Sequence, residues 1–100
     1  MEIILNEKKI NSVIKSLHYS SVNDLLKDNL ITEILFKISD FKTQINYFRN
    51  KYSLNFSKFK KEYNNNKEDY NKWDDLMAWE FATQAYKHWN EQLNTIKDVL

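Results

Sequence analysis

The chain of 100 residues contains no glycine, no proline and no cysteine. An average chain of this length has roughly seven glycines and about five prolines. Without them the backbone has few ways to reach positive φ, to form tight hairpins or to break a helix. Phosphate-cradling loops and nucleophile elbows depend on glycine, and thiolate sites and disulfides need cysteine, so these classes of site are excluded. The absences predict a few long helices joined by short polar corners.

The chain also lacks long apolar runs and clusters of catalytic side chains. No apolar stretch approaches the roughly 18 residues of a membrane span, and no basic segment precedes an apolar one, which predicts a soluble cytoplasmic protein. The two histidines, His18 and His88, lie far apart in the sequence, and no nucleophile–base–orienter set can be assembled from the spacing of the residues. We therefore expect no enzymatic activity, no cofactor and no metal.

The net charge of +1 conceals an uneven distribution of charge along the chain. Residues Lys42 to Lys61 include six basic side chains and no acidic one, whereas Glu62 to Glu80 include six acidic side chains and two lysines. Two interpretations are open. In the first, the basic and acidic segments face each other in the fold. In the second, both segments are solvated helix surfaces.

Apolar spacing predicts the order of the elements. A short extended segment covers residues 1–5, and a short helix follows from Asn6 or Glu7 to about Leu17. A long helix is expected over residues 22–52, a short one carries Phe56, Phe59 and Tyr63, and a last helix runs from near Glu68 towards Leu100. The predicted fold is all-α, with the two long helices forming an antiparallel helical hairpin. We divide the chain into a dimerisation segment, residues 1–38, and a partner-binding hairpin, residues 39–100.

Heptad spacing marks the facing sides of the two long helices. In the first helix the two rows are Ile31, Ile38, Ile45 and Tyr52, and Ile34, Phe41 and Phe48. In the last helix the row is Ala82, Tyr86, Trp89, Leu93, Ile96 and Leu100, with Trp79 one turn earlier. Trp89 is therefore expected in the core of the hairpin. Before the first long helix, Ser21 and Asp24 resemble a capping box in which Asp replaces the usual Glu or Gln.

The first 35 residues carry a resemblance to a known family. The segment Met1–Ile10, a short helix, and then His18 to Leu30 resemble the ribbon–helix–helix fold of Arc/MetJ/CopG-type repressors. The resemblance implies a homodimer, in which the extended segments of two chains form a ribbon that reads the DNA major groove. It places Glu2 and Ile4 on the groove-facing side of the ribbon. It also implies that Ser20, Ser21 and Val22, at the start of the second helix, hold a DNA phosphate.

The second half is similar to the C-terminal part of small prokaryotic antitoxin-like proteins. The similar residues are Lys51 to Phe59, followed by an acidic stretch and by Trp73 to Glu80. The similarity implies a segment that covers a cognate toxin, with Trp73 and Trp79 as anchors and with Asp74, Asp75 and Glu80 meeting a basic patch. For each tryptophan the alternative is a place in the intramolecular core.

Together the two resemblances imply an antitoxin-like protein that dimerises through its N-terminal part and neutralises a toxin through its helical C-terminal part. Operator DNA is a further implied partner. The alternative is a structural helical adaptor or assembly protein that does not contact DNA. Both resembled patterns use glycine at the two corners, where this chain has His18 and Ser53. Histidine tolerates positive φ better than most residues, and serine is a poorer replacement.

Overall fold

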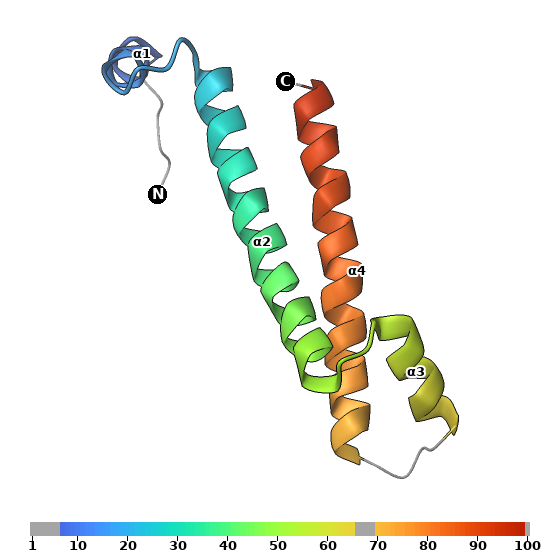
Figure 1. Ribbon diagram of the computed structural model, residues 1–100. Coiled ribbons are helices and arrows are strands. Elements are labelled where there is room, and N and C mark those ends of the chain that lie inside the picture. Colours follow the sequence, from blue (N-terminus) through green and yellow to red (C-terminus); the bar gives the residue numbers. More distant parts are fainter. Residues whose placement is uncertain (1–6, 66–69, 100) are drawn as a thin grey trace, which may run out of the picture.

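The computed structural model describes residues 7–65 and 70–99 and contains four helices in that part of the chain. They are α1 (Glu7–Ser16), α2 (Val22–Tyr52), α3 (Phe56–Asn65) and α4 (Tyr70–Val99), as Figure 1 shows. The predicted all-α fold and its antiparallel pair of long helices are confirmed, and the bounds of α2 agree with the prediction. The predicted extended segment, residues 1–5, lies outside the described residues.

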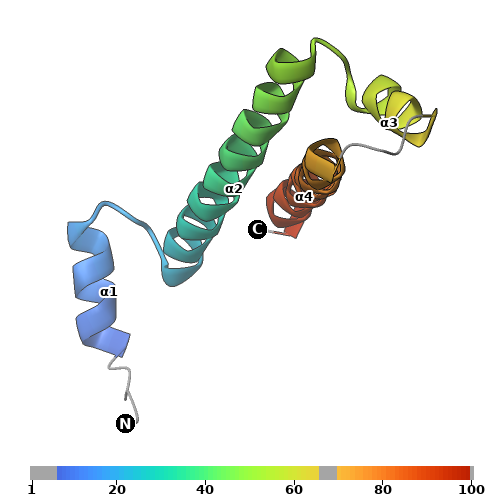
Figure 2. The same cartoon turned by 90° about the horizontal axis from the view of Figure 1, so that it is seen from below.

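The helices α2 and α4 lie beside each other and run in opposite directions (Figures 1 and 2). The predicted heptad rows form the seam between them, since each described residue of those rows is buried or partly buried. Ile34 and Phe48 of α2 and Ala82 of α4 are buried, and Trp89 is partly buried. The seam therefore follows from the apolar period of the sequence.

The core lies at the end of the hairpin where α2 finishes and α4 starts. There the short helix α3 packs against α4, and the buried cluster consists of Phe48, Phe59, Leu76 and Trp79. Trp79 is fully buried at its centre: its ring stacks on that of Phe48 at 5.6 Å and lies 5.2 Å from that of Phe59. Aromatic pairs at such separations add about 0.5–1.5 kcal/mol each beyond their buried area. This cluster ties three of the four helices together.

Both corners adopt the backbone conformation that usually selects glycine. His18 has φ 68°, and Ser53 has φ 54°. After α1, the N–H groups of His18 and Tyr19 donate to the carbonyls of Lys15 and Ile14, which is the hydrogen-bond pattern of a Schellman motif. After α2, the Ser53 N–H donates to the Arg49 carbonyl at 2.8 Å. The corners end the two helices without glycine.

The start of α2 shows the predicted capping interaction. The Ser21 hydroxyl accepts a hydrogen bond from the Asp24 N–H at 3.1 Å, and Ser21 has the extended backbone of an N-cap. Helix α1 lies on the side of α2 remote from α4 (Figures 1 and 2). It is joined to α2 by the corner that contains Tyr19, whose hydroxyl donates to Asp28 at 2.5 Å.

The resemblance to ribbon–helix–helix repressors is wrong. That fold requires a β-ribbon, and the structure has no strand among residues 7–65 and 70–99, which are almost entirely helical. The expected boundary between residues 38 and 39 falls inside the uninterrupted helix α2. Both predicted segments therefore share one helix.

Candidate protein-binding surface

The five residues predicted to bind a partner lie on the first three turns of α4, but they face different directions. Trp79 is fully buried in the core, between the rings of α2 and α3. Its predicted role as an anchor at the partner surface is therefore wrong in this conformation, because its ring is already covered by the chain's own aromatic side chains. Its alternative interpretation, a core residue, is correct.

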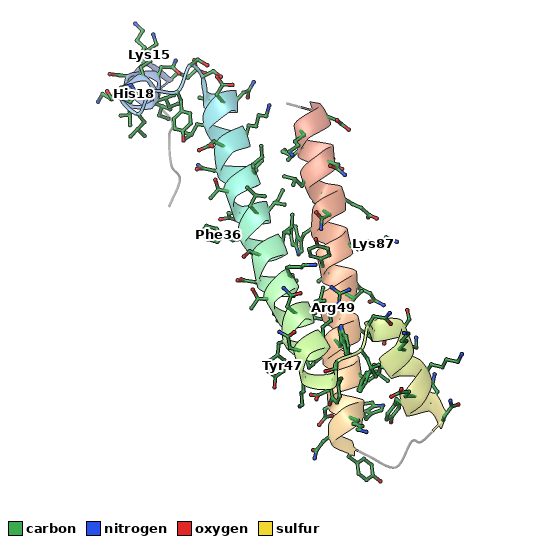
Figure 3. All side chains as sticks on the ribbon, in the orientation of Figure 1. Lys15, His18, Phe36, Tyr47, Arg49 and Lys87 are labelled. Carbon is green, nitrogen blue, oxygen red and sulfur yellow. The ribbon has the colours of Figure 1, made fainter. Side chains whose placement is uncertain are left out.

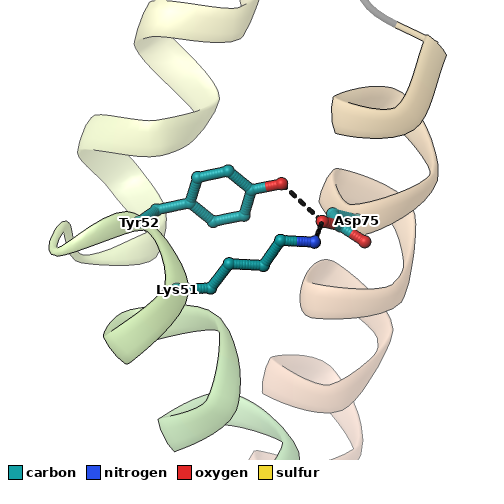
Figure 4. Close-up of polar contacts among 3 residues, drawn as sticks. All are labelled: Lys51, Tyr52 and Asp75. Atoms are coloured by element: carbon teal, nitrogen blue, oxygen red, sulfur yellow. Dashed lines mark hydrogen bonds and ion pairs between the residues drawn. The ribbon is translucent and has the colours of Figure 1, made fainter.

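Asp75 joins α4 to the end of α2 instead of facing outward (Figure 4). The Lys51 Nζ lies 2.7 Å from Asp75 Oδ2, and the Tyr52 hydroxyl donates a hydrogen bond to the same oxygen. Burial, aided by this hydrogen bond, raises the pKa of Tyr52 to about 12. Burial alone would raise the pKa of Asp75, but hydrogen bonds from Lys51 and Tyr52 outweigh it and lower that pKa. Asp75 is thus a structural carboxylate.

Glu80 is also used within the chain, since its Oε1 lies 3.6 Å from the Lys60 Nζ of α3. With the Lys51–Asp75 pair, this ion pair connects the basic segment to the acidic one. The interpretation that the two segments face each other is therefore confirmed at these two contacts. Such partly exposed pairs contribute modestly to stability, about 0–1 kcal/mol each.

Trp73 and Asp74, in contrast, are exposed. Trp73 lies in a row of large side chains on the outer face of α4, at 3-4-4 spacing: Tyr70, Trp73, Met77 and Phe81. Their exposed fractions are 87%, 47%, 38% and 62%. We call this row the α4 stripe. At 100° per residue it lies on the side of α4 opposite Trp79.

The α4 stripe is supported from behind by the core of the hairpin. The same turns of α4 that carry the stripe outward carry Leu76, Trp79 and Ala82 inward, and all three are buried. Phe81, at the end of the stripe, contacts Phe41 of α2 edge to face at 5.8 Å. The stripe is therefore a row of large side chains on a backbone that α2 and α3 hold in place.

The side chains of the stripe suit protein recognition. Tryptophan and tyrosine are enriched among residues that dominate binding energies, and aromatic residues and methionine are enriched in interface cores. The sequence reasoning identified Trp73 but missed Tyr70, Met77 and Phe81. Their 3-4-4 spacing was visible in the sequence, but it belongs to a second face of a helix whose first face was already assigned to the hairpin.

The residues predicted to bind DNA have other roles or lie outside the described part. Glu2 and Ile4 lie outside the described residues. Ser21 caps α2, the Ser20 hydroxyl donates to the Asp24 carboxylate, and Val22 is the exposed first residue of α2. Both serines thus interact with Asp24, which lies in the first turn of α2. Its negative charge interacts favourably with the helix dipole there. Helix capping accounts for these serines.

A second surface feature lies between the first half of α2 and the second half of α4. It is a groove of about 320 Å³, and its apolar lining residues are Leu30, Ile34, Trp89 and Ile96. Its polar lining residues are Glu33, Lys37, Gln92 and Thr95. It is separate from the α4 stripe, which begins at the other end of α4.

In the described part of the chain, no group of three or more acidic or histidine side chains is placed to hold a metal ion. The same residues include no helix that is both long and apolar enough to cross a bilayer. Comparisons with protein-family models, with curated proteins and with solved structures find no match to this chain. Its function must therefore be argued from its own surface.

Proposed function

We propose that this chain is a protein-binding helical hairpin whose α4 stripe docks onto an apolar groove of a partner protein. The observation that supports the proposal is the exposure of Tyr70, Trp73, Met77 and Phe81 in one row on a firmly packed helix. Four such side chains present a continuous apolar ridge about 16 Å long, at 1.5 Å per residue. Binding buries this ridge, and an amphipathic helix in a groove is a common mode of recognition.

The carboxylate of Asp74 predicts a further property of the partner, a basic side chain beside its groove. It is exposed beside the stripe, whereas the neighbouring carboxylates Asp75 and Glu80 are occupied by lysines of α2 and α3. A basic side chain at the rim of the partner's groove would pair with Asp74. Such a rim contact adds orientation and association rate more than affinity.

A toxin is one specific form of this partner. This possibility rests on the similarity of the segment from Trp73 to Glu80 to antitoxin-like proteins. Of the five residues that the similarity assigned to the toxin contact, Trp73 and Asp74 are exposed. In the alternative, this chain is an adaptor, which binds a second protein at the same time through another surface. An adaptor would be found in one complex with two other proteins, whereas an antitoxin would be found with its toxin alone.

Co-purification tests the proposal. The tagged chain is expressed together with the product of the adjacent gene, and the proteins that co-elute are identified. We expect Trp73→Ala to abolish co-elution, because a buried interface tryptophan contributes about 2 kcal/mol or more. Lys87→Ala, an exposed position on the same helix but outside the stripe, is the matched control and should leave co-elution unchanged. Equal recovery of the partner with both variants would rule out the α4 stripe.

A further inference from the structure

A row of uncharged side chains runs over 23 residues along the outer face of α2, remote from α4, and the carboxylates of Asp28 and Asp40 lie at its edges. The row reads Leu25, Asn29, Thr32, Phe36, Ser39, Thr43 and Tyr47, at 4-3-4-3-4-4 spacing, with Leu35 beside it. We call it the α2 stripe. Phe36 is 67% exposed and Tyr47 57%, and Figure 3 shows both side chains on the side of α2 away from α4. In a chain of which 29% is charged, a row of uncharged side chains with the large rings of Phe36 and Tyr47 exposed on it is a candidate interface.

The apolar side of helix α1 extends this face. Its residues Ile10, Val13 and Leu17 line an apolar depression together with Leu25, the first residue of the α2 stripe. Val13 and Leu17 are more than half exposed. Since α1 lies on the side of α2 remote from α4 (Figure 1), its apolar side chains and the α2 stripe form one continuous surface.

The chain exposes more surface than a compact protein of the same mass. The chain exposes 8129 Å², whereas a compact protein of its mass exposes about 6,100 Å². Its radius of gyration is 20.6 Å, against about 13 Å for a compact domain of 100 residues. The excess of roughly 2,000 Å² exceeds the ~800 Å² that each partner buries in a standard interface. The chain therefore has enough surface to form a stable dimer.

We propose that a second copy of the chain covers the α2 stripe, with the two α2 helices antiparallel about a two-fold axis at Phe36. Four residues of the stripe are arranged symmetrically about this residue, whereas the counterparts of Thr32 and Ser39 are Asp40 and Glu33. Leu25 and Tyr47 each lie 11 residues from Phe36, and Asn29 and Thr43 each lie seven residues from it. The antiparallel pairing thus places Phe36 against its own copy, Leu25 against Tyr47 and Asn29 against Thr43.

This pairing also covers α1. Because α1 adjoins Leu25, the antiparallel arrangement places its apolar face next to Tyr47 of the second copy. A parallel arrangement would bring the two α1 helices together at one end and leave Tyr47 exposed at the other. The stripe itself has no charged side chain that must lose water in the antiparallel pairing, and the nearest charge, Asp40 of each copy, lies beside Thr32 of the other.

The dimer goes beyond the partner binding proposed above, because the two stripes face opposite sides of the hairpin. The α2 stripe faces away from α4, and the α4 stripe faces away from the core between the helices. Both can be occupied at once. A dimer then displays two α4 stripes on its outer sides.

Sedimentation equilibrium tests the dimer. We expect the wild-type chain to have twice the single-chain mass of 12.2 kDa at micromolar concentrations. Phe36→Lys should sediment with the single-chain mass, because it places two ammonium groups at the axis. Phe81→Lys is the matched control, since Phe81 is 62% exposed and lies on the α4 stripe; it should remain dimeric. Circular dichroism confirms that each variant is helical. A monomeric wild type, or a dimeric Phe36→Lys variant, overturns the proposal.

Introduced cysteines test the relative orientation of the two α2 helices, because the chain has no cysteine of its own that would interfere. Under mild oxidation Phe36→Cys should form a disulfide-linked dimer. Leu25→Cys and Tyr47→Cys should cross-link when mixed, but neither should cross-link alone. Cross-linking of Leu25→Cys to itself would show a parallel pair, and no cross-linking by any of the three would show that the α2 stripe is not the interface. Neither outcome depends on a partner protein, so failure here is distinguishable from failure of the proposed function.

Discussion

Two residues with positive φ show how a chain without glycine ends its helices. His18 and Ser53 take the left-handed conformation that follows a helix, and both donate the hydrogen bonds of that position. For a residue with a Cβ this conformation costs about 1–2 kcal/mol, and histidine tolerates it better than serine. The sequence located both corners from the interruption of the apolar period. The cost of Ser53 is offset by the aromatic core that begins one residue earlier, at Tyr52.

Ser53→Gly should therefore stabilise the protein by about 0.5–1 kcal/mol, because glycine reaches positive φ without the steric penalty but adds freedom to the unfolded chain. Urea denaturation measures the change in the free energy of unfolding. Ala78→Gly is the control, since Ala78 is exposed within α4; it should destabilise the protein by about 1 kcal/mol. A destabilised Ser53→Gly variant would contradict the assigned backbone conformation.

The Lys51–Tyr52–Asp75 contact predicts a loss of stability at high pH. The folded state raises the pKa of Lys51, through the hydrogen bond to Asp75, and that of Tyr52 to about 12. A group whose pKa is higher in the folded state stabilises the protein fully at pH values below its pKa in the unfolded chain, which is near 10. This stability is lost as the pH rises through the pKa of the folded state. The lowered pKa of Asp75 contributes stability that is lost as the pH falls through its folded value, below the usual 3.8.

Tyr52→Phe keeps the ring packed on Trp79 but removes the ionisable hydroxyl. We expect its free energy of unfolding to fall less steeply than that of the wild type between about pH 10 and 12. At neutral pH the variant should lose about 0.5–1.5 kcal/mol with the hydrogen bond to Asp75. Urea denaturation across this pH range provides the measurement, and parallel curves for the two proteins would show that Tyr52 does not titrate as described.

At the scale of the elements, helix positions were predictable and helix faces only partly so. The period of apolar residues defined α2 to the residue and set the seam with α4. It placed Trp79 one turn before the seam row, but the similarity to antitoxin-like proteins assigned both Trp73 and Trp79 to the partner surface. The docking of α3 decides between them: Phe56 and Phe59 cover Trp79 and leave Trp73 exposed. Contacts between separate helices of this kind have no signature in local spacing.

Replacing Trp73 and Trp79 by alanine, one at a time, should distinguish the exposed tryptophan from the buried one. Trp79→Ala removes a fully buried ring and should cost about 3–5 kcal/mol. Trp73→Ala should change the free energy of unfolding by less than about 1 kcal/mol, because its ring is half exposed. Denaturant titrations of the two variants give the comparison. Similar losses for both variants would contradict the placement of α3.

For the whole molecule, the sequence predicted the helical hairpin but resembled a dimeric fold that the structure does not have. The prediction of a homodimer stays open, although its proposed basis has moved from a ribbon at residues 1–5 to the α2 stripe. The resemblance failed because a short helix, a corner and a single capping box at the start of a longer helix are compatible with many helical folds.

A dimer makes thermal stability depend on concentration, because association stabilises the folded state by mass action. The melting temperature of the wild type should rise as the protein concentration is increased. That of Phe36→Lys should stay constant over the same range. Differential scanning calorimetry provides the test, and a concentration-independent melting temperature for the wild type would argue for a monomer.

The central claim, that α4 presents one tryptophan to a partner and keeps the other in the core, is tested most directly by hydroxyl-radical footprinting. The method reports the exposure of aromatic and methionine side chains in the free protein and in the complex that co-purification yields. We predict that Trp73, Met77 and Phe81 are oxidised in the free chain and protected in the complex, while Trp79 is unreactive in both. Unchanged oxidation of Trp73 in the complex, or a reactive Trp79 in the free chain, would contradict the account.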